Sequence, residues 1–158
     1  MNSSLNTPSD NLLRPYENKD FDNVIDLLKG NIPKFFAPIE LEDYKNYLLH
    51  SREDYFVLER ANQIIAVGGI NYLPDDNLAR LAWDMVHIDF HKRGFGAMLL
   101  NYRMQHIKRH TSFTSVDVRS SQFAFKFYQK QNFRLVCQEK DFWGPGFDLY
   151  HLIQNLIQ

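Results

Sequence analysis

Cysteine is almost absent from this chain of 158 residues, because Cys137 is the only one. A single thiol excludes an internal disulfide and any cysteine-rich zinc site. The sequence also has no apolar run close to the roughly 20 residues that span a membrane. Neither sign of charge is in excess, since 18 Lys and Arg residues against 19 Asp and Glu residues give a formal net charge of −1. We therefore expect no membrane, no nucleic acid and no metal among the partners.

The amino-terminal stretch MNSSLNTPSD is polar and lacks the apolar core of a signal peptide. We expect residues 1–10 to form a flexible tail and residues 11–158 to form one domain in the cytoplasm. Hydrophobic residues make up 44% of the chain, which is enough to bury a sizeable core. The composition leaves a monomer and a homodimer equally open.

Apolar residues recur with helical spacing in two segments. In the first, Asn18 or Asp20 can cap a helix that ends near Gly30. In the second, the stripe expected to face the core is Phe95, Met98, Leu99 and Tyr102. The second helix is expected at 94–109. The remaining elements expected are helices at 40–51 and 120–133, a hairpin at 55–73, and strands at 12–13, 78–88, 115–119, 135–139 and 147–152. This order favours the α/β class (mixed α+β), with a mixed sheet covered by helices.

Three basic residues, His91, Lys92 and Arg93, precede a glycine pair, Gly94 and Gly96, at a strand-to-helix junction. Basic side chains are unfavourable at a helix N-terminus, which carries partial positive charge. An anionic ligand bound by the free amides of that helix explains them, whereas a tight turn with solvated charges is the alternative. The dinucleotide fingerprint GxGxxG is excluded because Leu99 occupies the third glycine position.

The stretch HKRGFGAMLL resembles the acyl-CoA pyrophosphate loop of the GNAT acetyltransferase superfamily, written [QR]-x-x-G-x-[GA], with His91 at the position of Gln or Arg. The later stretch VRSSQFAFKFYQKQNF resembles the family's N-x-x-A-x-x-[FL]-Y-x-K-x-G-F segment. Its matching positions are Ala124, Phe127, Tyr128, Lys130 and Phe133. Ser121 and Asn132 replace the usual Asn and Gly. The resemblance spans residues 11 to 153 and is most similar to uncharacterised bacterial members.

The resemblance implies one mixed, largely antiparallel sheet of about six to seven strands, flanked by about four helices and splayed between the fourth and fifth strands. It also implies transfer of the acetyl group of acetyl-CoA to a primary amine by direct attack in a ternary complex, without a metal. In that interpretation the residues that bind acetyl-CoA are Val86, Ile88, His91, Lys92, Arg93, Gly94, Phe95, Gly96, Ala97, Ser121 and Tyr128. The Val86 amide is expected to bind the thioester oxygen, and Ser121 either binds the pantetheine arm or caps a helix.

By the same resemblance Tyr128 is the general acid for the departing thiolate, with a core tyrosine as the alternative. Asp84 is the first candidate for a general base, because a carboxylate in an apolar strand is costly unless it is paired or functional. A structural ion pair with Arg80 or Arg119 is the alternative. His87 and an ordered water are the remaining candidates.

The resemblance places the amine acceptor between the first inter-helix loop and the last hairpin. The aromatic residues there, which form either the acceptor wall or core plugs, are Phe35, Phe36, Phe142, Trp143 and Phe147. We expect Cys137 to be a core thiol, since the sequence places no histidine beside it. A catalytically idle domain of the same fold, which binds acyl-CoA as a sensor or interaction module, is the alternative function.

Overall fold

The computed structural model describes residues 10–156. The tail expected at residues 1–10 therefore lies outside the described residues, apart from Asp10. The elements are β1 (Asn11–Pro15), α2 (Phe21–Asn31), α3 (Glu40–Asn46), β2 (Asp54–Arg60), β3 (Gln63–Leu73), β4 (Leu78–Val86), α4 (Phe95–His110), β5 (Ser115–Ser120), α5 (Phe125–Lys130), β6 (Arg134–Gly144) and β7 (Phe147–Asn155). The seven strands form one mixed sheet in the order β1-β2-β3-β4-β5-β7-β6, which confirms the expected fold class.

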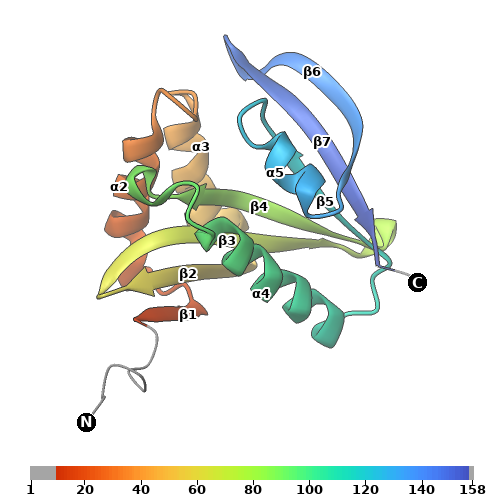
Figure 1. Ribbon diagram of the computed structural model, residues 1–158, viewed down its shortest axis with the longest axis horizontal. Helices are drawn as coiled ribbons and strands as arrows, with labels where there is room; N and C mark the ends of the chain where they lie inside the picture. The colour runs from red at the N-terminus through yellow and green to blue at the C-terminus, as the bar shows by residue number, and fades with distance from the viewer. Residues whose placement is uncertain (1–9, 157–158) are drawn as a thin grey trace.

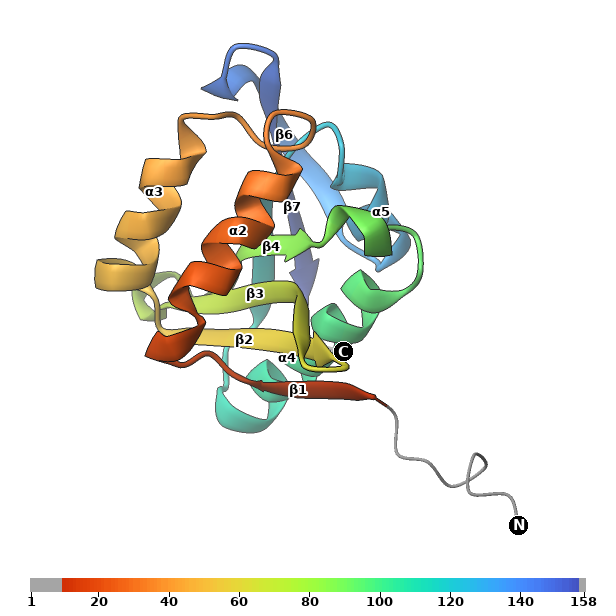
Figure 2. The ribbon, with the colours of Figure 1, turned by 90° about the vertical axis from the view of Figure 1, so that its left-hand side faces the viewer.

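Helices cover both faces of the sheet. Figure 2 shows α2 and α3 in front of β2, β3 and β4, with α4 behind them. Under α2 and α3 the core is built from Val24, Leu28, Tyr44, Val57 and Val67, among others. Under α4 and α5 it is built from residues such as Ile70, Leu99, Ile107, Val116 and Leu152. Both cores follow from apolar side chains that recur on one helix face and on alternate strand positions.

The sheet opens between β4 and β5. These two strands pair in parallel only from Leu78 opposite Ser115 to Leu81 opposite Val118, although β4 continues to Val86. Figure 1 shows β5, β6 and β7 turning away from β4 beyond that point. This confirms the splay between the fourth and fifth strands.

A β-bulge lies in the half of β4 that pairs with β3 but not with β5. Gly69 faces Ala82 and Val67 faces Met85, so β4 advances three residues while β3 advances two. Trp83, within the bulge, has a φ of +51°, which is rare for a large side chain. Such bulges redirect the side chains next to them, and the one redirected here is Asp84.

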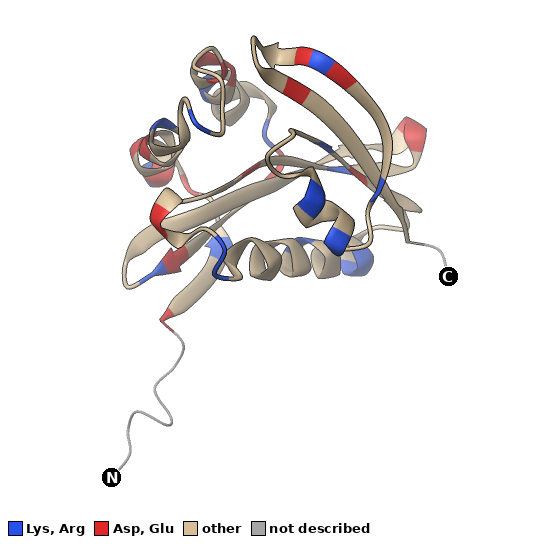
Figure 3. Ribbon diagram, turned by 45° about the horizontal axis from the view of Figure 1, so that its top comes forward, with Lys and Arg blue, Asp and Glu red and all other residues tan. Residues whose placement is uncertain are grey.

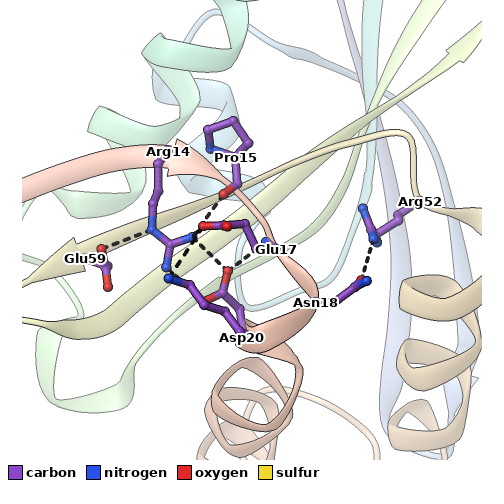
Figure 4. A network of polar contacts seen from close by, with 8 residues as sticks. Arg14, Pro15, Glu17, Asn18, Asp20, Arg52 and Glu59 are labelled. Atoms are coloured by element: carbon purple, nitrogen blue, oxygen red, sulfur yellow. Dashed lines mark hydrogen bonds and ion pairs between the residues drawn. The ribbon is translucent and has the colours of Figure 1, made fainter.

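Arg14 holds the first strand to the turn that follows it (Figure 4). Its guanidinium donates to both carboxylate oxygens of Asp20, at 2.8 and 2.9 Å, and to Glu59 on β2 at 3.1 Å. Asp20 also accepts the Glu17 amide at 2.8 Å. The expectation that Asn18 or Asp20 caps α2 is therefore wrong, because neither side chain caps this helix. The Asp20 carboxylate binds the Arg14 guanidinium instead.

Several expected boundaries need correction. The strands β6 and β7 meet at a two-residue turn, so the segment expected to be a loop between them is mostly strand. The expected strand to residue 88 ends at Val86, and Ile88 lies in a short 3-10 turn. Cys137, expected in the core, is exposed on β6. On α4 the core stripe is rotated from the expected one: Met98 is 38% exposed, and the buried residues are Phe95, Leu99, Leu100, Arg103, Met104 and Ile107.

Among residues 10–156, no helix is both long enough and apolar enough to cross a bilayer. Charged residues of both signs are distributed over the fold (Figure 3), with basic residues on α5 and in the last turn of α4. Acidic residues occupy the first turn of α3, where they suit the helix dipole.

Candidate active site

A cleft of about 1220 Å³ lies where β4 and β5 separate. Its walls come from β4, the end of β5, the start of α4, α5, the loop between α2 and α3, and the adjoining ends of β6 and β7. Of the residues expected to bind acetyl-CoA or to act in catalysis, those that line it are Asp84, Val86, His91, Lys92, Gly94, Phe95, Gly96, Ala97, Ser121 and Tyr128. The fold therefore gathers two sequence segments that are far apart, the glycine turn and the start of α5, around one space.

Tyr128 and Asp84 form a hydrogen-bonded pair in this cleft. The Tyr128 hydroxyl, on α5, donates to Oδ2 of Asp84 at 2.5 Å. Arg103, on α4, holds the same carboxylate from the other side, with Nη1 at 2.5 Å from Oδ1 and Nη2 at 2.7 Å from Oδ2. The partner of Asp84 is thus neither Arg80 nor Arg119, the two expected alternatives; Arg80 pairs with Asp117.

Space for the buried guanidinium comes from a glycine. Arg103 is 1% exposed, and it donates from Nη1 to the carbonyl of Gly69 at 3.0 Å. A Cβ at Gly68 would lie 2.8 Å from Cζ of Arg103, which is closer than real contacts allow. Gly68 in the middle of β3 is therefore explained by the ion pair beneath it. A Cβ at Gly69 would instead clash with the side chains of Tyr55 and Tyr47.

The environment keeps Tyr128 protonated. Burial raises the pKa of its phenol well above the usual value of 10, and the negative charge of Asp84 raises it further. Arg103 acts in the opposite direction but does not cancel the effect. Tyr128 therefore enters any reaction at neutral pH as a neutral hydrogen-bond donor.

The start of α4 has the geometry of an anion site. Gly94, with φ of +89°, adopts a left-handed conformation that side chains disfavour, and Met98 makes the first helical bond back to it. The first amides of the helix lack intrahelical acceptors, and residues 94–97, which carry them, line the cleft. Lys92 lines the cleft beside them, whereas the Arg93 guanidinium lies over the rings of Phe90 and Phe95 at 5.0 and 5.7 Å.

The end of β4 presents its backbone to the cleft. The amide of His87 donates to Ile65 on β3 at 2.7 Å, so the neighbouring Val86 backbone faces the opposite edge of the strand. In agreement, the Val86 carbonyl accepts from Nε2 of His91 at 2.7 Å and from Nδ2 of Asn31 at 3.2 Å. By the geometry of a strand, the Val86 amide lies on the same edge as this carbonyl.

Three other expected residues have different surroundings. Ile88 is 38% exposed and is not among the cleft-lining residues of the described chain. His87 lies outside the cleft lining too, and its Nδ1 accepts the Asp89 amide at 3.1 Å. Ser121 lines the cleft, and its hydroxyl accepts the Phe123 amide at 3.2 Å in the turn before α5, whose N-cap is Ala124, so Ser121 does not cap the helix itself.

Aromatic side chains form the far end of the cleft. Of the five expected there, Phe35, Phe36, Trp143 and Phe147 line it. Phe142 lies outside and packs on the Arg119 guanidinium at 4.9 Å. Trp143 donates from Nε1 to the Ser120 carbonyl at 3.1 Å, which ties the tip of β6 to the end of β5.

A sequence model of the acetyltransferase (GNAT) domain matches residues 14–149. The chain belongs to the GNAT acetyltransferase family. No curated protein sequence matches it significantly. Solved structures with this fold include a GNAT-family protein from Desulfovibrio desulfuricans (TM-score 0.76, 17% identity, covering 93% of this chain and 99% of that one) and an N-acetyltransferase from Staphylococcus aureus (0.74, 14%, 94% and 100%). An aminoglycoside 6'-N-acetyltransferase solved with coenzyme A is similar as well (0.74, 12%, 93% and 98%).

Sequence reasoning missed two cleft residues of this GNAT domain, Arg103 and Glu40. Arg103 could have been found from its spacing, because it lies four residues after Leu99 and four before Ile107, on the apolar stripe of its helix. Glu40 had no such signal, since an acidic residue in the first turn of a helix is ordinary.

Proposed function

We propose that this protein transfers the acetyl group of acetyl-CoA to a primary amine, by direct attack within a ternary complex. The observation that carries the proposal is the Tyr128–Asp84 pair at the point where β4 and β5 part, with the glycine turn of α4 beside it. An acid, a base and a backbone donor therefore face one space.

The residues of the cleft fit acetyl-CoA, which supplies its acetyl group as a thioester. The first amides of α4 and the Lys92 ammonium would hold its pyrophosphate, and the open edge of β4 would hold its pantetheine arm. His91 differs from the family pattern, because its Nε2 donates to the Val86 carbonyl. In this chain His91 therefore orients the end of β4, and its contribution to phosphate binding is indirect.

Proton transfer in this proposal uses Asp84 and Tyr128 as one relay. Asp84 takes a proton from the attacking amine, and loss of its negative charge removes one of the causes that raise the pKa of Tyr128. Tyr128 then donates its own proton to the departing thiolate and regains one from Asp84. The Val86 amide donates to the oxygen on which negative charge develops. Arg103 holds the Asp84 carboxylate in place throughout.

The test is an acetylation screen across small amines, amino acids, polyamines, aminoglycosides and peptide termini, followed by release of free thiol from acetyl-CoA. We expect release that depends on at least one amine class and that falls sharply in the Asp84→Asn variant. Binding of acetyl-CoA by calorimetry without thiol release from any amine would contradict the transferase proposal and favour the acyl-CoA sensor.

A further inference from the structure

Glu40, at the start of α3, is a buried carboxylate that the proposed reaction does not use. It is 6% exposed and lines the cleft. Its Oε2 accepts the Ala37 amide at 2.8 Å, in the turn just before α3. That hydrogen bond uses one of the two carboxylate oxygens of Glu40, and it does not compensate the negative charge of the ionised group.

The other buried carboxylates of the described chain are compensated. Asp20 pairs with Arg14 at 2.8 Å, and Asp117 pairs with Arg80 at 2.9 Å. Among residues 10–156, Glu40 has no Lys, Arg or His within ion-pair distance, so it is the exception among the three buried acids. Burial raises the pKa of Glu40 to about 7, with a smaller contribution from the nearby charge of Asp43. An uncompensated carboxylate of this kind gains from a cation supplied by a ligand.

Aromatic side chains that line the same cleft as Glu40 suit a cation. Phe36 and Trp83 line the same cleft, with nearly parallel rings whose centroids are 6.5 Å apart. Tyr44, one helical turn after Glu40, packs on Trp83 at 4.8 Å. The faces of aromatic rings attract ammonium and guanidinium groups, most strongly where water is excluded.

Four of the cationic side chains that line the cleft contact groups other than Glu40. Arg103 and Arg80 are bound by Asp84 and Asp117, respectively. The Lys34 ammonium lies over the Phe35 ring at 5.3 Å, and the Arg119 guanidinium lies over Phe142 at 4.9 Å. Lys34 and Arg119 face the cleft from the inter-helix loop and from β5, so they are the groups that an acidic acceptor would use instead.

We propose that Glu40 is a cation subsite, at which the amine acceptor places a second, positively charged nitrogen group while its first amine reaches Asp84 and Tyr128. The acceptor class is therefore a diamine, a polyamine or an amine that also carries a guanidinium. This inference rests on the proposed function, because it assigns the acceptor end of the same cleft.

The experiment compares linear diamines, from 1,3-diaminopropane to 1,8-diaminooctane, with monoamines of the same carbon number. We expect kcat/KM in the wild type to be higher for the best diamine than for its monoamine by roughly tenfold or more, the size of a charge-assisted contact. The Glu40→Gln variant should lose this preference, chiefly through KM, and keep its rate with monoamines. The matched control is Glu42→Gln, which makes the same charge change on an exposed residue of α3 and should behave as the wild type.

A second measurement separates failure of this subsite from failure of the proposed reaction. Thermal unfolding with coenzyme A present should shift upward with the diamine but not with the monoamine, in the wild type and in Glu42→Gln but not in Glu40→Gln. That pattern without thiol release would support the subsite and contradict the transferase. Equal use of diamines and monoamines by the wild type, or a preference for an amino dicarboxylate, would contradict the cation subsite. This result comes from the wild type alone, so it does not depend on whether the Glu40→Gln variant folds.

Discussion

The Tyr128 hydroxyl and Oδ2 of Asp84 lie 2.5 Å apart, although the two residues come from α5 and β4 and are 44 positions apart in the chain. The candidate acid and the candidate base are therefore directly coupled. Variants of two groups in such contact should show effects that do not add.

The first prediction concerns the phenol. Tyr128→Phe removes the donor and leaves the ring packing, so kcat should fall by about 10²-fold or more, the typical contribution of a positioned proton donor. The KM for acetyl-CoA should stay nearly unchanged, because the pyrophosphate site is separate. Steady-state thiol release measures both, with Tyr150→Phe as the control, since Tyr150 packs on Phe125 of the same helix. An unchanged kcat would remove Tyr128 from the acid role.

The second prediction concerns the ion pair below the cleft. Arg103→Met leaves Asp84 without its cation in a largely buried place, so the free energy of unfolding should drop by about 3–5 kcal/mol. Adding Asp84→Leu should recover much of that loss, because the unpaired charge is then gone. Urea unfolding of the single and double variants tests this. A double variant that loses the sum of both single effects would show that the two residues do not interact.

The third prediction follows from the pKa of Asp20. The hydrogen bond from Arg14 lowers this pKa below its ordinary value of 3.8. A lowered folded-state pKa stabilises the protein above about pH 4 and ceases to do so as the pH falls through the folded value. Wild-type stability should therefore decline below pH 4 more steeply than that of Asp20→Asn.

The same variant has a predicted cost at neutral pH. Replacing Asp20 by Asn weakens two charge-assisted bonds to Arg14, so we expect a loss of about 2 kcal/mol at pH 7. Urea midpoints at pH 7 and pH 3 give both quantities. Parallel pH curves for the two proteins would mean that Asp20 has the same pKa folded and unfolded.

Local patterns explain how much of this molecule could be predicted. The period of apolar residues located the helices and strands, and the glycine turn with Tyr128 located the two halves of the cleft. The β4 bulge could not be predicted, because it depends on register against β3. The Asp84–Arg103 pair could not be predicted either, since it joins a strand and a helix through space. Likewise, the burial of Arg103 on α4 depends on the space at Gly68 of β3, which the helical pattern alone does not show.

The fourth prediction tests the corrected position of Cys137. A register shift between Leu135 and Cys137 turns this thiol out of the core, opposite His151 on β7. The His151 ring donates from Nε2 to Asp117 at 2.7 Å, so its Nδ1, 3.9 Å from Sγ, can accept the thiol proton. The native protein should therefore react with DTNB and release one thionitrobenzoate per chain, as the thiolate attacks the disulfide of the reagent.

The His151→Ala variant isolates the histidine from mere exposure. It should react several-fold more slowly at neutral pH, because the nearby proton acceptor is lost. The control variant His50→Ala, in the helical turn that follows α3, should react like the wild type. Absorbance at the thionitrobenzoate band gives both the stoichiometry and the rate. Reaction only after unfolding in urea would mean that the thiol is buried, and equal rates in His151→Ala and the wild type would mean that the imidazole takes no part.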